Sequence, residues 1–199
     1  MQKRPSARRN RAGRGLQTLP TAVFLVGYMG AGKTTVGRIM ARQLGWEFSD
    51  LDEQIERRHG RSVVEIFRRS GESAFRDLEH AELRRLIAKV RSGKHTIAAL
   101  GGGAIAQPRN LSLLRRHKFP IVFLDAPVET LRRRCLRQAR STGIRRPLLG
   151  TMSEFRDRYE QRRRFYRQAS HKTATSGRGP SSIAQELIAA LRLVPSRST

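Results

Sequence analysis

The stretch VFLVGYMGAGKTT occupies residues 23–35 and decides the fold. Its four apolar residues at 23–26 predict a buried strand, and apolar residues at helical spacing over 36–44 predict a helix after it. The turn between them matches the pattern GxxxxGKT from Gly27 to Thr34, which is informative in this strand–turn–helix setting. The stretch therefore predicts a cradle for nucleotide phosphates, with a chance glycine-rich turn as the alternative.

The physical basis of this prediction is the backbone of the turn. Glycines let several N–H groups point inward, and the helix N-terminus adds positive potential. We expect Lys33 to reach the β- and γ-phosphates of ATP as co-substrate, and Thr34 to bind one Mg²⁺ ion per subunit. The residues expected to contact the nucleotide in this loop are Gly30, Ala31, Gly32, Lys33, Thr34 and Thr35.

Strand and helix patterns alternate along the rest of the chain. Further strands are predicted at 46–49, 96–100 and 120–124, and residues 170–180 give only a weak strand signal. Helices are predicted at 53–58, 62–67, 72–90, 128–140, 153–167 and 181–193. This alternation predicts an α/β fold, a three-layer α/β/α arrangement around a central parallel sheet of about five strands.

Length and composition favour one domain in a reducing compartment. The chain has 199 residues, and its single cysteine, Cys135, excludes an intrachain disulfide. No apolar run approaches the roughly 20 residues that span a bilayer, and no secretion signal is visible at the N-terminus. We therefore expect a cytoplasmic protein that does not associate with membranes.

The charge is strongly positive, with 41 Lys and Arg against 16 Asp and Glu and a formal net charge of +25. Such a charge attracts polyanions, whether nucleotide, nucleic acid or acidic metabolite. Residues 1–21 are basic and acid-free and are predicted to form a disordered arm, with an organelle transit peptide as the alternative. We expect the domain to span 22–194, followed by a disordered tail at 195–199.

Two carboxylates follow the predicted second strand. Asp50 and Asp52 are two residues apart, so in an extended segment both side chains face the same way, toward the strand ends where α/β sites form. One can serve Mg²⁺ and the other a substrate hydroxyl. The alternative interpretation is a helix N-cap, because Asp is common before a helix.

Two later features also have both a structural and a functional interpretation. The run Gly101, Gly102 and Gly103 is either a flexible turn or a place where backbone N–H groups closely approach a ligand. Arg145 and Arg146 lie in a predicted mobile lid at about 141–151. They are either a solvated charge run or the source of an arginine that stabilises a transferred phosphoryl group when the lid closes.

Taken in order, these motifs resemble shikimate kinase, a family with the P-loop kinase type of fold. The resemblance runs from about residue 22 to residue 193. It rests on the phosphate loop, Asp50-Leu51-Asp52, Gly71-Glu72-x-x-Phe75-Arg76, Gly101-Gly102-Gly103-Ala104 and Arg146-Pro147-Leu148-Leu149. It implies that the γ-phosphoryl group of ATP is transferred to the 3-hydroxyl of shikimate, a step of aromatic amino-acid biosynthesis, by a monomer.

The resemblance also implies roles for residues on the substrate side. Asp50 helps to hold Mg²⁺ through water, and Asp52 binds the ring hydroxyls and orients or deprotonates the attacking one. Arg76 and Arg162 grip the substrate carboxylate, for which planar guanidinium forks are well suited. Gly102 offers a backbone N–H to the ring. Arg163 and Arg164 are the alternatives to Arg162, whose spacing to Tyr166 fits the family pattern.

On the nucleotide side, the resemblance implies that Arg146 touches the phosphates and, with Lys33 and Asp52, completes the catalytic set. Arg140 would lie against the adenine, and Arg178 would contact the nucleotide unless it is a plain surface arginine. Residues 172–175 lack the aspartate usual for the family at this point, which leaves that end of the adenine pocket open.

Two rival functions remain at this level. One is another small-metabolite kinase, such as a gluconate kinase, and the combination of Arg76 with the triple glycine argues against it. The other is a non-catalytic ligand-sensing or nucleic-acid-binding protein, suggested by the charge. No DNA-reading module is visible in the sequence, so we expect small-molecule partners rather than nucleic acid.

Overall fold

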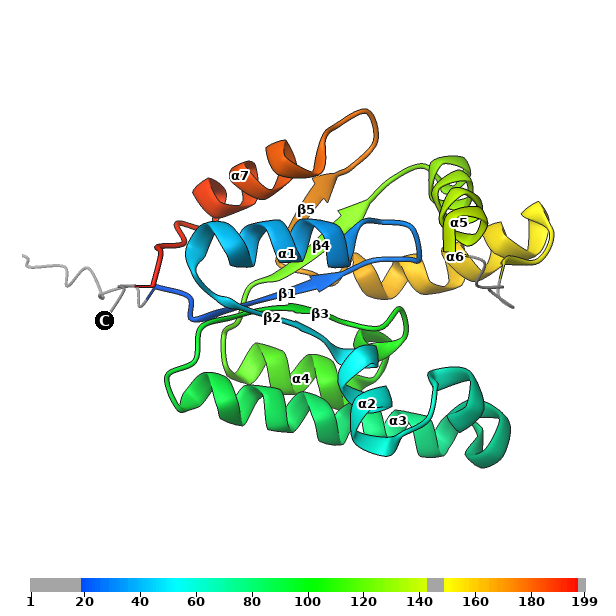
Figure 1. Cartoon of the computed structure of the whole chain (residues 1–199), viewed down its shortest axis with the longest axis horizontal. Helices are drawn as coiled ribbons and strands as arrows, with labels where there is room; N and C mark the ends of the chain where they lie inside the picture. Colours follow the sequence, from blue (N-terminus) through cyan, green and yellow to red (C-terminus); the bar gives the residue numbers. More distant parts are fainter. Residues whose placement is uncertain (1–18, 143–148, 197–199) are drawn as a thin grey trace, which may run out of the picture.

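The computed structural model describes residues 19–142 and 149–196 (Figure 1). The predicted N-terminal arm at 1–21 lies outside these ranges except for its last three residues. Arg145, Arg146 and the middle of the predicted lid lie outside them as well.

The centre of the fold is a five-stranded parallel sheet, as the sequence predicts. Its strands are β1 (Ala22–Val26), β2 (Glu47–Asp50), β3 (Thr96–Ala99), β4 (Ile121–Asp125) and β5 (His171–Ala174), in the order β2-β3-β1-β4-β5. The central strand β1 is buried along its whole length, because helices cover both faces of the sheet. All five strands are parallel, so their carboxyl ends meet at one edge.

The helices form a layer on each side of the sheet (Figure 1). On one face lie α1 (Lys33–Leu44) and α7 (Pro180–Ala190), and on the other α3 (Val63–Arg91) and α4 (Pro108–Arg116). The remaining helices are α2 (Leu51–His59), η1 (Ala104–Ala106), α5 (Val128–Thr142) and α6 (Met152–Tyr166). None of the helices in the described ranges is long and apolar enough to cross a membrane.

Some elements differ from the sequence prediction, each for an identifiable reason. The predicted helices at 62–67 and 72–90 form one run, α3, which is kinked at Gly71, where φ is 78°. Helix α4 was not predicted at all, and it begins with Pro108 at its first turn. Strand β5 gave a weak signal because it is a polar edge strand that pairs only with β4.

Candidate active site

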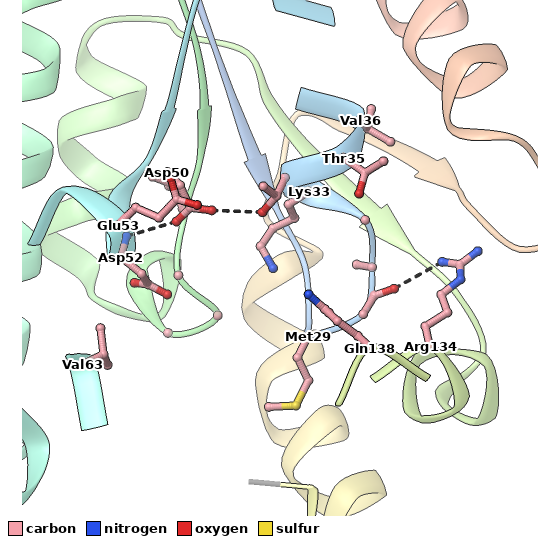
Figure 2. A pocket seen from close by; sticks show the side chains of 18 of the residues that line it. Met29, Lys33, Thr35, Val36, Asp50, Asp52, Glu53, Val63, Arg134 and Gln138 are labelled. Atoms are coloured by element: carbon pink, nitrogen blue, oxygen red, sulfur yellow. Dashed lines mark hydrogen bonds between the residues drawn. The ribbon is translucent and has the colours of Figure 1, made fainter. Parts of the chain in front are cut away.

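A cleft of about 1010 Å³ opens at the carboxyl ends of the strands (Figure 2). The phosphate loop forms its floor, the start of α2 and the triple-glycine run form one side, and α5 forms the other. The register of the sheet brings these parts together, because Asp50 at the end of β2 pairs with Ala99 at the end of β3. Most of the residues that the sequence singled out therefore lie around one cavity.

The phosphate loop is shaped by glycines at positions that other residues do not fit. Gly30 has a φ of 79°, and a Cβ atom there would lie 2.5 Å from the carbonyl oxygen of Leu131 in α5. Within the loop, the Lys33 Nζ donates to the carbonyl oxygens of Gly27 at 2.9 Å and Tyr28 at 3.3 Å. The ammonium group thus lies across the loop, beside the N-terminus of α1.

For Asp50 the structure confirms the helix N-cap interpretation. Its Oδ1 accepts a hydrogen bond from the backbone N–H of Asp52 at 3.2 Å and caps α2, while its Oδ2 accepts one from the Thr34 hydroxyl at 3.0 Å (Figure 2). The premise of a shared extended segment was wrong, because Asp50 ends β2 and Asp52 lies in the first turn of α2. The capping turn, rather than strand periodicity, directs Asp52 into the cleft.

Asp52 lies next to the triple-glycine run. A Cβ atom on Gly101 would be only 2.6 Å from Asp52 Oδ1 and 3.1 Å from Glu79 Oε1, so only glycine leaves room for both carboxylates. Burial, reinforced by the negative charge of Asp50 and opposed by Lys33, raises the pKa of Asp52 to about 6. Asp52 is therefore a carboxylate that can accept a proton near neutral pH.

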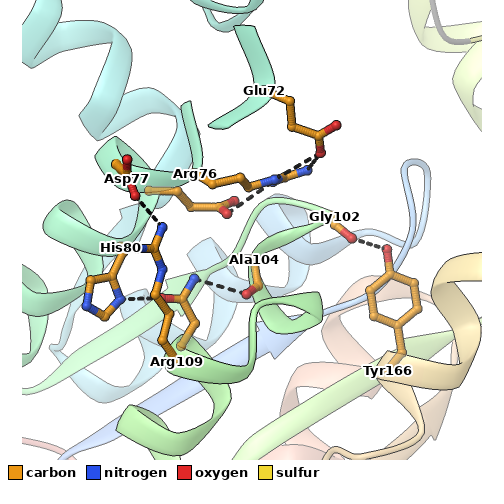
Figure 3. A network of polar contacts seen from close by, with 10 residues as sticks. Glu72, Arg76, Asp77, His80, Gly102, Ala104, Arg109 and Tyr166 are labelled. Atoms are coloured by element: carbon orange, nitrogen blue, oxygen red, sulfur yellow. Dashed lines mark hydrogen bonds and ion pairs between the residues drawn. The ribbon is translucent and has the colours of Figure 1, made fainter. Parts of the chain in front are cut away.

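Arg76 is held between two glutamates of its own helix (Figure 3). Its Nη2 donates to Glu72 Oε1 at 2.9 Å and its Nη1 donates to Glu79 Oε2 at 3.1 Å. A Cβ atom on Gly103 would come within 2.4 Å of the Arg76 guanidinium, so the glycine loop and the arginine pack directly against each other. This arrangement aims a fixed guanidinium fork at the cleft.

Glu79 is a site residue that the sequence analysis missed. Its side chain is fully buried, and its Oε1 has no hydrogen-bond partner, while its Oε2 pairs with Arg76. Burial, opposed by Arg76, raises the pKa of Glu79 to about 7. The available signal was its position three residues after Arg76, which places both side chains on one helix face.

Arg162 approaches the cleft from α6. A Cβ atom on Gly102 would lie 2.9 Å from its Nη1, and the Tyr166 hydroxyl donates to the Gly102 carbonyl oxygen at 2.6 Å (Figure 3). Arg162 lines the same cleft as Arg76, whereas neither Arg163 nor Arg164 does. The structure therefore brings Arg76 and Arg162 to the glycine run, one from each side.

Arg134 is a second residue that the sequence analysis missed. Its guanidinium donates to the Gly30 carbonyl oxygen at 3.3 Å and to the hydroxyl and carbonyl oxygens of Thr175 at 2.9 and 2.6 Å. It thereby ties the phosphate loop to the segment after β5. The sequence placed Arg134 in a very basic helix, as the last of three consecutive arginines, where no pattern distinguishes it from its neighbours.

The two other arginines that were predicted to contact the nucleotide, Arg140 and Arg178, differ in their relation to the cleft. Arg140 is not among the residues that line the cleft, and it borders a separate hollow between α5 and the start of α6. Arg178 does line the cleft, where it is paired with Glu186 of α7. Arg146 lies outside the described residues.

The cleft thus has two chemically different halves. The half around the phosphate loop offers backbone N–H groups, an ammonium group and two hard oxygen donors, which suit phosphates and a divalent cation. The half around the glycine run offers two guanidinium forks beside the buried carboxylate of Glu79 and the partly buried one of Asp52. These groups suit a small acid that also carries hydroxyl groups. Asp52 borders both halves, because it lies against Gly101 and interacts electrostatically with Lys33 of the phosphate loop.

The family model and the relatives that are more than 30% identical to this chain indicate one family. The family model described as shikimate kinase matches residues 29–192. The chain is 36% identical to the shikimate kinase of Persephonella marina over 85% of this chain and 98% of that protein. It is similar to the solved structure of shikimate kinase from Acinetobacter baumannii in complex with shikimate, with a TM-score of 0.76, 37% identity, and coverage of 88% of this chain and 94% of that one. It is also similar to the solved structure of shikimate kinase from Bacteroides thetaiotaomicron, with a TM-score of 0.74 and 35% identity. That match covers 86% of this chain and 98% of the other chain.

Proposed function

This chain belongs to the shikimate kinase family, and we infer from that premise that it transfers the γ-phosphoryl group of ATP to the 3-hydroxyl of shikimate. The products are shikimate 3-phosphate and ADP, in the pathway to chorismate and the aromatic amino acids. The alternative of a gluconate kinase is not favoured by the family match.

One observation carries the assignment of the site. A single cleft holds the phosphate loop at one end and two guanidinium groups, Arg76 and Arg162, at the other, with Asp52 between them. Shikimate has a carboxylate at one end of its ring and hydroxyls at the other. An acid gripped by both arginines would therefore present its hydroxyls toward Asp52 and the phosphates.

Lys33 and the loop backbone act on the nucleotide. Charge spreads over the transferred phosphoryl oxygens in the transition state, so fixed positive groups there lower the barrier. Lys33 would exchange its bonds to the loop carbonyls for the β- and γ-phosphates. The N–H groups between Gly30 and Thr35 would hold the phosphates by hydrogen bonds at the start of α1.

Asp52 acts on the acceptor. Its carboxylate would accept a hydrogen bond from the 3-hydroxyl and take up its proton as the oxygen attacks. A pKa raised to about 6 suits this role, because the group is ionised at neutral pH yet basic enough to hold a proton. Asp52 would also lower the barrier by holding the hydroxyl in line with the phosphoryl group.

Thr34 and Asp50 fit a Mg²⁺ ion. Their side-chain oxygens lie 3.0 Å apart at the start of α1, and Mg²⁺ prefers hard oxygen donors of this kind, supplemented by water and substrate phosphates. Asp50 would hold the ion through water. When bound, the ion neutralises charge on the phosphates.

The remaining arginines divide between nucleotide and substrate. We assign the carboxylate of shikimate to Arg76 and Arg162, and the ring contact to the backbone of Gly101, Gly102 and Gly103. We assign Arg134, rather than Arg140, to the base side of the nucleotide, because Arg134 lines the cleft beside Thr175 and Arg140 does not. Arg178 is assigned to the same side, and Arg146 to the phosphates as the lid arginine.

The test is an assay of ADP release with shikimate and gluconate side by side. We expect ADP release that depends on shikimate and Mg²⁺, with shikimate 3-phosphate identified by ³¹P NMR. Gluconate at the same concentration should give no more than the background rate. Equal or faster turnover with gluconate, or no turnover with shikimate, would contradict the proposal.

Four further assignments accompany this function. We propose that the enzyme is a cytoplasmic monomer whose partners are its small-molecule substrates rather than nucleic acid. We also propose that the catalytic domain spans 22–194, preceded by a basic arm and followed by a short tail. Sedimentation of the purified chain, with and without residues 1–21, would check both the monomer and the domain boundary.

A further inference from the structure

Tyr28 belongs to the phosphate loop, but its side chain does not line the cleft. It is 1% exposed and packs against two aromatic rings of α6. The centroid of the Tyr28 ring lies 5.1 Å from the Phe155 centroid and 5.7 Å from the Tyr159 centroid. The angles between the ring planes are 78° and 66°, respectively. These edge-to-face contacts mean that α6 packs on a residue of the loop that binds the nucleotide.

The same ring lies under the guanidinium group of Arg162. The Arg162 Cζ atom is 5.8 Å from the Tyr28 ring centroid, within the range of a cation–π contact. Burial raises the pKa of Tyr28, and the positive charges of Arg162 and Arg158 oppose this rise, so the phenol is neutral and close to both guanidinium groups. Tyr28 thus provides the surface on which the Arg162 guanidinium lies.

On its other side, Arg162 is confined by the glycine loop. Any side chain on Gly102 would meet Arg162 at 2.9 Å and the Tyr166 hydroxyl at 3.2 Å, and Tyr166 is anchored to the Gly102 carbonyl oxygen (Figure 3). Arg162 therefore lies between Tyr28 and Gly102. A shift of either support would change where its fork points.

We propose that Tyr28 is a positioning residue for Arg162, so that the phosphate loop itself sets the orientation of the group that grips the substrate carboxylate. The inference rests on the proposed function, since it assigns the carboxylate to Arg162. Tyr28 makes no contact with substrate in this arrangement and acts only through the arginine. Because the cation–π contact needs the ring and not the hydroxyl, a phenylalanine at this position should position Arg162 as well as tyrosine does.

The experiment compares three substitutions by steady-state kinetics. Tyr28→Leu and Tyr28→Met remove the ring while keeping an apolar side chain, and Tyr28→Phe keeps it. Loss of a cation–π contact corresponds to a factor of about 2 to 30 in binding. We expect the KM for shikimate to rise by that factor in the first two variants, with the KM for ATP and kcat within about twofold of wild type. Tyr28→Phe should behave as wild type.

The matched control is Phe155→Leu, which removes a ring from the same cluster without a cation–π contact to Arg162. It should lower the melting temperature without a selective change in the KM for shikimate. A second readout is a shikimate analogue with a hydroxymethyl group in place of the carboxylate. Binding of this analogue should not respond to Tyr28→Leu, and Tyr28→Leu should have no further effect in an Arg162→Met background.

The outcomes separate this inference from the function on which it rests. If wild-type enzyme does not phosphorylate shikimate, the proposed function fails. If wild type is active and both Tyr28→Leu and Tyr28→Met keep the wild-type KM for shikimate, the positioning role is wrong. If Tyr28→Leu weakens the binding of shikimate and of the uncharged analogue equally, or raises the KM values for shikimate and ATP equally, Tyr28 has a general structural role. Either result would also overturn the positioning role.

Discussion

At the scale of single residues, the site concentrates acidic groups in a strongly basic chain. Glu79 is fully buried and Asp52 is partly buried near it, and both have raised pKa values, about 7 for Glu79 and about 6 for Asp52. Burial of a carboxylate disfavours its charged form unless hydrogen bonds compensate, and Glu79 Oε1 has no such partner. A bound ring that carries hydroxyl groups would donate hydrogen bonds to these carboxylate oxygens and would compensate the cost of their burial.

The roles of Asp52 and Lys33 can be tested by substitutions that keep side-chain size. General-base assistance contributes about 10²- to 10⁴-fold, so Asp52→Asn should lower kcat by at least about 100-fold. Lys33→Met should lower it similarly, because it removes the positive charge beside the transferred group. Circular dichroism should show an intact fold in both. Near-normal turnover in either purified variant would refute the role assigned to that residue.

Glu79 should make stability depend on pH. Its folded-state pKa of about 7 lies above the ordinary value of 4.5, so the folded state keeps a proton that the unfolded state releases. The stabilisation is complete below pH 4.5 and is lost as the pH rises through about 7. Glu79→Gln stays neutral throughout. Relative to this variant, wild type should lose up to about 3 kcal/mol of unfolding free energy between pH 4.5 and 8.

Urea denaturation of both proteins at several pH values measures this difference. Asp52 titrates in both proteins, so the comparison isolates Glu79 together with its repulsion by the Asp52 charge. The variant should also raise the KM for shikimate, because Glu79 holds the Arg76 guanidinium. A constant difference in unfolding free energy across this pH range would contradict the linkage.

At the scale of elements, the site is assembled where strand ends meet helix starts. The run after β3 carries three glycines, and each approaches a different polar side chain. Gly101 lies against Asp52, Gly102 against Arg162 and Gly103 against Arg76. The loop is therefore a spacer whose missing side chains leave room for the three side chains that we assign to substrate binding.

Gly103→Ala tests this spacer role. Gly103 has φ −110° and ψ −8°, which alanine adopts without strain, so the expected effect comes from the contact with Arg76 alone. We expect a rise of about tenfold or more in the KM for shikimate with a smaller change in the KM for ATP. The control is Gly179→Ala, whose Cβ would meet nothing within 4 Å. Equal KM values for shikimate in the two variants would contradict the spacer role.

At the scale of the whole molecule, the chain carries a formal net charge of +25. The ion pairs of the described residues engage only some of the arginines, and many of these pairs are exposed and contribute little. Unbalanced charge of one sign destabilises a compact state through self-repulsion. The same field attracts the anionic substrates toward the cleft.

Salt should therefore stabilise the fold. The Debye length falls from about 30 Å at 0.01 M to about 8 Å at 0.15 M, which screens repulsion between distant arginines. We expect the melting temperature to rise by several degrees between 0.01 and 0.3 M NaCl. KCl should give the same rise, since only ionic strength matters in this explanation. A melting temperature that is flat or falling with either salt would contradict it.

The sequence by itself determined the sheet, the phosphate loop and most of the substrate side. Period and spacing are local properties, so residues 23–44 predicted β1, the loop and α1. The strands β3 and β4 followed from apolar runs, whereas the polar strand β5 gave only a weak signal. The ordered motifs identified the family. Asp50, Asp52, Arg76, Arg162 and the three glycines were named from the sequence, and the structure brings all of them to one cleft.

Only the tertiary structure decided which of many similar side chains enter that cleft. Arg134 differs from its neighbours in α5 only because Gly30 and Thr175 lie within its reach, and Glu79 only because the fold buries it beside Asp52. Strand β5 exists because β4 offers it a partner, and Tyr28 supports Arg162 because α6 packs on the loop. Such contacts join residues distant in the chain, so no local pattern records them.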